Sequence, residues 1–261
     1  MQTAAFFDLD KTVIAKSSTL AFGKPFYKAG FFGKRTLMKM GFGQLMYVLF
    51  GADEDALRRA RDQMLELTEG WHRAEIEQLV DETLDEIADP LVYAEALTLI
   101  EQHKQEGRRV YLVSASPEQI VRPIGRHIGV PDIIATRIKT DAAGFFLAEI
   151  DQYVMGPGKS EAIVALAEQE DIDLAESYAY SDSVTDLPMM EIVGHPVAVN
   201  PEKELRKIAE ERDWPILEFQ RPVAMEPIIP RPSPIAGIAF VASLGALAAA
   251  IALLRKRART G

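Results

Sequence analysis

Two carboxylates stand one residue apart near the start of the chain, directly after a short apolar run. Asp8 and Asp10 follow the residues TAAFF at positions 3–7. An apolar run of this kind is typical of a central parallel strand that is buried on both faces. Burying two like charges at the end of such a strand is costly unless a function uses them. Asp8 and Asp10 are therefore the first candidates for catalysis or metal binding.

Polar side chains occur at three later points of the chain where a strand ends or a helix begins. Ser114 ends the apolar run YLVS, Lys159 follows a Gly-Pro-Gly turn at 156–158, and Asp182 and Asp186 follow SYAY. Taken singly, each has an ordinary structural explanation, as a strand-end hydroxyl, a surface lysine or a solvent-facing acid. Taken together they indicate one catalytic site, because the carboxyl ends of parallel strands meet at one edge of a sheet.

The elements that would position these residues alternate along the chain. The pattern predicts strands at 3–7, 108–116, 176–183 and 195–200, and helices at 91–106, 117–128 and 159–170. This alternation indicates an α/β fold with a doubly wound parallel sheet. Residues 16–89 show helical stripes and no strand, so we interpret them as a helical cap inserted into a catalytic core formed by 1–15 and 90–220.

Four motifs in this order resemble those of the haloacid dehalogenase superfamily of hydrolases, specifically its phosphoserine-phosphatase-like branch, subfamily IB. The matching residues are DLDKT at 8–12, SAS at 114–116, Lys159, and SDSVTD at 181–186. The resemblance covers roughly residues 3–220. It implies a Rossmann-like core with a cap, and a phosphomonoester hydrolase that forms an aspartyl-phosphate intermediate.

The resemblance implies a nucleophile, an acid and a metal site. Asp8 would attack phosphorus, while Asp10 would protonate the leaving alkoxide and then activate water. Mg²⁺ suits an oxygen-only site and would be held by Asp8, Asp182 and the backbone carbonyl of Asp10. Neighbouring carboxylates raise the pKa of Asp10 and a metal lowers it, so the sequence does not fix the sign of the net shift.

Four further residues would support this chemistry. Ser114 and Lys159 are expected to hold phosphoryl oxygens, and Lys159 also offsets the carboxylate charge. Thr12 is expected to bind the substrate phosphate or to hydrogen-bond within the first motif. Asp186 would support the metal shell or orient Lys159. The four histidines show no metal-ligand spacing.

The charge of the chain is unevenly distributed. The 261 residues carry a formal net charge of −10 and no cysteine, which argues against a nucleic-acid partner and excludes disulfides and thiol catalysis. Residues 11–52 contain no acid and carry +7, from Lys11, Lys16, Lys24, Lys28, Lys34, Arg35 and Lys39. With their interleaved aromatic residues they suit an anionic, partly apolar surface such as a bilayer or a lipid phosphate. A cap with buried aromatic residues and solvated lysines explains the same pattern.

The sequence supports the reaction more firmly than the substrate. Phosphoserine phosphatases of this branch carry a glutamate nine residues after the nucleophile, where this chain has Ser17. Their Ser-Gly-Gly is Ser-Ala-Ser here, and Thr185 replaces an asparagine. A lipid phosphate or a small phosphorylated metabolite is therefore preferred, with phosphoserine as one alternative. A membrane-bound sensor of phosphorylated ligands that has lost turnover is another.

The C-terminal part is expected to form a membrane anchor. Residues 221–234 are rich in proline and read as a linker, 235–254 contain no charge, and 255–261 form a basic tail. A helix of twenty uncharged residues spans roughly 30 Å, the thickness of a bilayer core. The absence of a basic leader indicates a cytoplasmic catalytic domain. The basic tail favours the same side, so either the tail crosses or the helix lies in one leaflet. Small residues in the segment would permit pairing into a homodimer.

Overall fold

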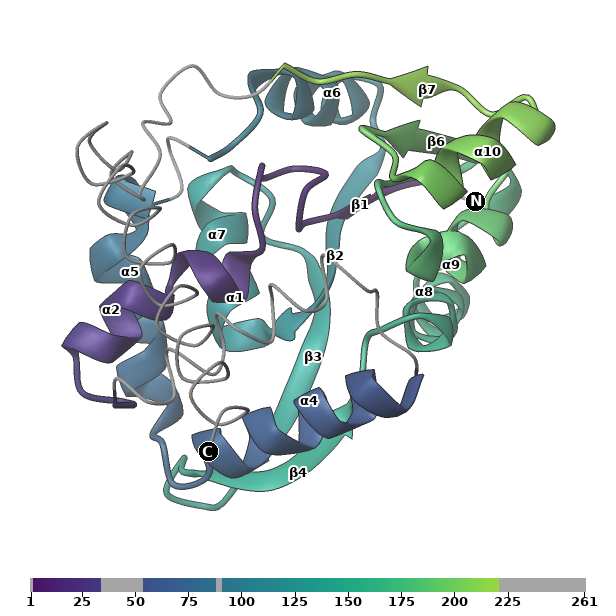
Figure 1. Ribbon diagram of the computed structural model, residues 1–261. Coiled ribbons are helices and arrows are strands. Elements are labelled where there is room, and N and C mark those ends of the chain that lie inside the picture. Colours follow the sequence, from purple (N-terminus) through teal and green to yellow (C-terminus); the bar gives the residue numbers. More distant parts are fainter. Residues whose placement is uncertain (1, 34–53, 88–90, 221–261) are drawn as a thin grey trace, which may run out of the picture. The chain divides into compact units, whose positions relative to one another are not determined.

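One mixed sheet carries the described part of the chain, which comprises residues 2–33, 54–87 and 91–220 of a computed structural model. The sheet has seven strands in the order β4-β3-β2-β1-β5-β6-β7 (Figure 1). The strands are β1 Ala4–Asp8, β2 Arg109–Pro117, β3 Ile133–Thr140, β4 Phe146–Gln152, β5 Tyr178–Ser181, β6 His195–Val199 and β7 Ile216–Leu217. All neighbours are parallel except β3 and β4. The described residues belong to the first of two units, Met1–Val223 and Ala224–Gly261.

Strand β1 lies at the centre of the sheet because its residues are apolar on both faces. All five of its residues are buried. Phe6 stacks on Tyr111 of β2 on one face, with 5.4 Å between ring centroids. On the opposite face, Phe7 stacks on Tyr180 of β5 at 4.3 Å. Both faces of the strand are thus covered, as the apolar run predicts.

Helices cover both faces of this sheet. In chain order the core helices are α6 Ala94–Gln105, α7 Glu118–His127, α8 Pro157–Glu170, α9 Leu187–Glu191 and α10 Lys203–Glu211. On the face that carries Phe6, the core includes Ile163 of α8, Met189 of α9 and Leu205 of α10. On the other face, His103 of α6 contacts Phe7 edge-on. This arrangement is the doubly wound architecture that the alternating pattern predicts.

The regular elements described in the segment expected to form a cap are all helices. It contains α1 Ser18–Ala21, α2 Gly23–Lys28, α4 Glu54–Thr68 and α5 Arg73–Ile87. Helix α5 packs on α7, and α4 packs on β4. On α5, the stripe of Ile76, Val80 and Leu84 is buried. The boundaries expected for the cap, 16–89, stay a prediction.

The sheet also departs from the sequence expectation at its edge. The four expected strands correspond to β1, β2, β5 and β6, whereas β3, β4 and β7 were not predicted. Strands β3 and β4 pair antiparallel, so the sheet is mostly parallel rather than wholly parallel. A tight turn joins them, in which Asp141 Oδ1 accepts hydrogen bonds from the backbone N–H groups of Ala143 and Phe145, each at 2.9 Å. Local turn chemistry therefore overrides the βαβ alternation at this edge.

The linker, anchor and basic tail expected at 221–234, 235–254 and 255–261 lie outside the described residues. Among the helices that are described, none is both long enough and apolar enough to cross a membrane.

Candidate active site

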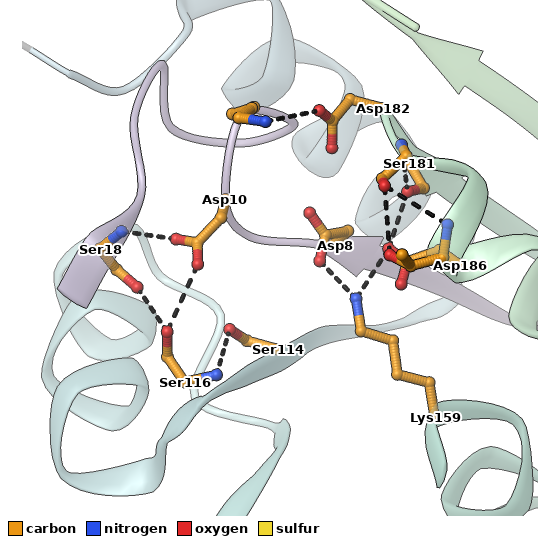
Figure 2. A network of polar contacts seen from close by, with 12 residues as sticks. Asp8, Asp10, Ser18, Ser114, Ser116, Lys159, Ser181, Asp182 and Asp186 are labelled. Carbon is orange, nitrogen blue, oxygen red and sulfur yellow. Dashed lines mark hydrogen bonds and ion pairs between the residues drawn. The ribbon is translucent and has the colours of Figure 1, made fainter. Parts of the chain in front are cut away.

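The residues expected to carry the chemistry gather at the carboxyl ends of three neighbouring strands. Asp8 is the last residue of β1, which pairs with β2 on one side and β5 on the other. Ser114 lies toward the end of β2, and Asp182 directly follows β5. Figure 2 shows these side chains pointing into a common region together with Lys159 of α8. The topology thus brings together residues that are far apart in the sequence.

A buried lysine bridges two carboxylates at the centre of the site. Lys159 Nζ donates to Asp8 Oδ1 at 2.5 Å and to Asp186 Oδ2 at 2.7 Å. Its side chain is 4% exposed. Burial lowers the pKa of Lys159, but the two carboxylates outweigh burial and raise the pKa above its ordinary value. Lys159 therefore stays charged and orients Asp8.

The start of α8 positions this lysine through two glycines and a proline. Gly156 has φ +55° and precedes the helix, and Pro157 occupies the first turn, where its missing N–H costs nothing. A Cβ on Gly158 would lie 2.1 Å from the carbonyl oxygen of Tyr153, so no side chain fits there. The Gly-Pro-Gly turn therefore fixes the point at which Lys159 leaves the helix.

A second hydrogen bond holds Asp186 in place. Ser181 Oγ donates to Asp186 Oδ2 at 2.7 Å, the same oxygen that Lys159 binds. The loop that carries Asp186 is tied down by Glu202, whose Oε1 accepts from the backbone N–H of Val184 at 2.8 Å. Of the two roles expected for Asp186, the geometry matches the orientation of Lys159.

The carboxylates nearest the strand ends are destabilised in their charged form. Burial is the main factor that raises the pKa of Asp8 well above its ordinary value, although Lys159 acts in the opposite direction. Burial likewise raises the pKa of Asp182 to about 7, while Lys11, 3.8 Å away, lowers it. Two buried carboxylates with raised pKa values form a site that a cation would stabilise.

The donor set fits Mg²⁺ in chemistry. The described residues contain no group of three or more His, Asp or Glu side chains arranged to hold a metal. The expected site needs only two, from Asp8 and Asp182, because its third protein ligand is the backbone carbonyl of Asp10. Oxygen ligands completed by water are what Mg²⁺ prefers. The residues present are thus compatible with the ion, and its binding stays a prediction.

Asp10 is held by partners on two different elements. Its Oδ1 accepts from the backbone N–H of Ser18, at the start of α1, at 2.6 Å. Its Oδ2 accepts from Ser116 Oγ at 3.3 Å. Burial raises the pKa of Asp10, and the hydrogen bonds from Ser18 and Ser116 oppose that rise. In the absence of a metal, the net direction is upward, which suits a group that must donate a proton.

Thr12 does not make the hydrogen bond expected within the first motif. Its side chain is fully buried, and Oγ1 has no hydrogen-bond partner. Lys11, the preceding residue, adopts φ +64°, and Val13 and Ile14 both donate their N–H groups to the carbonyl of Leu9. The backbone closes this turn by itself, which leaves the hydroxyl unused. A role of Thr12 toward substrate phosphate stays a prediction.

The site also contains three serines that the sequence analysis did not single out. Ser18, Ser116 and Ser181 contact Asp10 or Asp186, as described above. Ser116 and Ser181 lie inside the matching motifs, so their position was a usable signal. Ser18 lies outside the motifs and gave no signal, because its main contribution to Asp10 comes from the backbone N–H. Ser114 accepts from the N–H of Ser116 at 3.1 Å, so its hydroxyl also shapes this loop.

A doubly wound sheet with a carboxylate pair, a lysine and an acidic loop at the carboxyl ends of its strands is typical of phosphohydrolases with a Rossmann-like fold. The family of haloacid dehalogenase-like hydrolases matches residues 5–191, which include every site residue from Asp8 to Asp186. The chain belongs to this family. It is an enzyme of phosphatase type and is similar to phosphoserine phosphatases.

The similarity to known proteins covers almost the whole chain and is not confined to the motifs. A probable phosphatase of Mycobacterium tuberculosis is 49% identical over 260 residues, which are 98% of this chain and 90% of that protein. A phosphoserine phosphatase of the same organism is 31% identical over 259 residues, 98% of this chain and 81% of that protein. A crystal structure of a Bordetella pertussis Tohama I protein of unknown function has a TM-score of 0.73 at 26% identity, covering 83% of this chain and 98% of that one.

Proposed function

We propose that this protein is a Mg²⁺-dependent phosphomonoesterase that acts through an aspartyl-phosphate on Asp8. The observation that carries the proposal is the buried ion network in which Lys159 binds both Asp8 and Asp186. Such a network fixes a carboxylate at the point where a phosphate dianion would arrive, and its lysine opposes the rise in pKa that burial causes. Asp10, two residues further along, supplies the proton.

The reaction follows from the contacts of these side chains. Lys159 holds Oδ1 of Asp8, so we assign Oδ2 as the oxygen that attacks phosphorus. The new Asp8–phosphorus bond forms as the bond to the leaving oxygen breaks, and Asp10 gives that oxygen its proton. In the second step Asp10, now a carboxylate, takes a proton from water as the water oxygen bonds to phosphorus and the Asp8–phosphorus bond breaks. Inorganic phosphate leaves, and both carboxyl groups return to their starting state.

Mg²⁺ would be held by Asp8, Asp182 and the backbone carbonyl of Asp10. When bound, the ion supplies positive charge that offsets the charge of the phosphate and the carboxylates. We expect Ser114 to hold a phosphoryl oxygen; in support, it directly follows Val113, the residue of β2 that pairs with Asp8.

A lipid phosphate or a small phosphorylated metabolite is the proposed substrate, and residues 235–254 are the proposed membrane tether. The support is the sequence: an acid-free, aromatic-rich stretch and a charge-free C-terminal segment. Phosphoserine is the second candidate, favoured by the similarity to a phosphoserine phosphatase. Against it stands Ser17, directly before Ser18, whose N–H binds Asp10. A substrate ammonium group would meet a hydroxyl at this position instead of a carboxylate.

Substitution of Asp8 by asparagine tests the proposed reaction. We expect Asp8→Asn to abolish Mg²⁺-dependent release of phosphate from a panel that includes phosphoserine and lysophosphatidate, because an amide is not a nucleophile here. The matched control is Asp151→Asn, the same change at an exposed ion pair with Arg137 on the β3–β4 hairpin. Full activity of Asp8→Asn would refute the mechanism. A parent protein that binds phosphate analogues without turnover would support the sensor alternative.

A further inference from the structure

Ser116 lies at the centre of a cluster of hydroxyl groups beside Asp10. Its Oγ donates to Asp10 Oδ2 at 3.3 Å and lies 2.9 Å from Ser18 Oγ and 3.1 Å from Thr19 Oγ1 (Figure 2 labels all but Thr19). Ser116 is 6% exposed and Ser18 is fully buried. The cluster thus joins β2 to the start of α1 around one carboxyl group. In proteins of the same branch with Ser-Gly-Gly, this position has no side chain.

The local backbone of β2 presents Ser116 toward Asp10. The register between β2 and β3 is regular as far as Ser114 and shifts between Ser114 and Pro117. Irregularities of this kind bend a strand and redirect its side chains, and they are common next to active sites. The N–H of Ser116 donates to Ser114 Oγ and so fixes the loop from within.

The directions of the hydrogen bonds follow from counting protons. A serine hydroxyl has one proton to donate and two lone pairs that accept. Because Ser116 gives its single proton to Asp10, any hydrogen bond that its Oγ makes with the hydroxyls of Ser18 and Thr19 is one that Ser116 accepts. Ser116 thus contacts Asp10 Oδ2 directly, and its two neighbours surround Ser116.

The other oxygen of Asp10 is fixed by a different kind of donor. The backbone N–H of Ser18 can only donate, and its bond to Oδ1 is short at 2.6 Å. Both oxygens of Asp10 therefore accept a hydrogen bond, Oδ1 from a backbone N–H and Oδ2 from a hydroxyl, and we assign Oδ2 as the oxygen that exchanges a proton. The terminal torsion of an aspartate is broad, so contacts at both oxygens are needed to hold the plane of the carboxyl group.

We propose that Ser116 is a positioning residue that holds Oδ2 of Asp10 toward the leaving group of the substrate. This inference rests on the proposed function, in which Asp10 is the acid. Ser116 acts through Asp10, so its importance depends on how much the leaving group needs a proton. An alkoxide leaves only with a proton, whereas p-nitrophenolate leaves without one.

The test compares two phosphomonoesters that differ in this need. For Ser116→Ala we expect kcat/KM on ethyl phosphate, which reports the steps up to release of the alcohol, to fall roughly tenfold or more, and kcat/KM on p-nitrophenyl phosphate to change less than about twofold. Ser116→Thr, which keeps the hydroxyl, should restore most of kcat/KM on ethyl phosphate. Equal losses on both substrates, or no loss on either, would overturn the proposal.

A matched control separates positioning from stability. Ser177 is also a buried serine; its Oγ accepts from the N–H of Ala4 and donates to the carbonyl of Asp173. It directly precedes β5 and so lies at the amino ends of the strands, away from the site. Ser177→Ala should lower thermal stability without changing the ratio of the two kcat/KM values. If Ser177→Ala changes this ratio as Ser116→Ala does, Ser116 has a structural role only.

Two further measurements keep this inference distinct from the proposed function. In an Asp10→Asn background, Ser116→Ala should cause no additional loss, because the two residues act as one unit. A crystal structure of Ser116→Ala should show the Asp10 carboxyl group rotated away from its position in the parent protein. An unmoved carboxyl group would refute the positioning role of Ser116, whatever the activity of the parent protein. Failure of the parent protein to hydrolyse either ester would refute the proposed function.

Discussion

Lys159 is the residue on which the charge balance of the site depends. Its ammonium group is shared by two buried carboxylates, and Ser181 supports one of them. A buried carboxylate without a partner is far less stable than one in an ion pair. The same lysine therefore contributes to folding and to catalysis, and the two effects can be measured separately.

Replacement of Lys159 by methionine keeps the length of the side chain and removes its charge. We expect Lys159→Met to lower the free energy of unfolding at pH 7 by about 3–5 kcal/mol, as measured by urea denaturation. Activity should fall by at least about a hundredfold, because the phosphate and both carboxylates lose their cation. Lys207→Met, which removes an exposed pair with Glu211, serves as the control. A stability loss no larger than that of the control would contradict this account.

At the scale of elements, the contact between α6 and β5 links a core helix to the strand that precedes Asp182. His103 of α6 lies 2.7 Å from Tyr180 Oη, and its Nδ1 lies 3.2 Å from a guanidinium nitrogen of Arg108. Arginine can only donate, so Nδ1 accepts and Nε2 carries the proton that Tyr180 receives. His103 is therefore neutral in the folded protein.

This contact makes stability depend on pH. Burial, with Arg108 next in importance and Glu106 opposing them, lowers the pKa of His103 from 6.5 to about 4. Between these values the unfolded chain binds more protons than the folded one, so stability falls as the pH falls. We expect His103→Gln to make the free energy of unfolding less dependent on pH from 6.5 to 4, by at most about 1.4 kcal/mol per pH unit. Unfolding curves at several pH values measure this slope. An unchanged slope would contradict the prediction.

The sequence predicted best those strands whose residues form a continuous apolar run. The apolar runs predict β1, β2, β5 and β6 because a strand buried on both faces leaves a continuous signal. Strands β3 and β4 were not predicted because buried and exposed residues alternate along them. Glu149 and Asp151 of β4 form solvent-exposed ion pairs with basic residues of β3. Strand β7 has only two residues and gives no pattern.

In the site, too, some residues were predicted and some contacts were not. Asp8, Ser114, Lys159, Asp182 and Asp186 were predicted together, because each ends a strand or begins a helix. Backbone donors carry no sequence signal, so the N–H of Ser18 on Asp10 was not foreseen. The unused hydroxyl of Thr12 was also not foreseen, because a turn closed by backbone hydrogen bonds alone cannot be recognised from residue types.

At the scale of the whole molecule, we predict that the protein is held on a membrane by residues 235–254. The nine strongly apolar residues in this segment contribute about −3 to −5 kcal/mol of apparent insertion free energy. Two arginines near its centre would cost about 5–7 kcal/mol and cancel that gain. The full chain should therefore stay in the membrane pellet after an alkaline carbonate wash, whereas a variant with Ala242→Arg and Ala246→Arg should be released. The matched variant with leucine at both positions should stay bound. Release of the parent protein would disprove the tether.

The central place of β1 has a consequence for how the molecule assembles. This strand is made well before its two neighbours, which begin at Arg109 and Tyr178. Pairings this distant in sequence form slowly, because a long loop must close before any contact repays the lost entropy. Until Tyr178 and the residues after it leave the ribosome, Asp8 has neither a strand on both sides nor the Asp186 that shares its lysine. The buried charges therefore meet late, when most of the apolar core is already available to enclose them. Catalytic competence would then mark the end of folding, and an interrupted chain would have no active site.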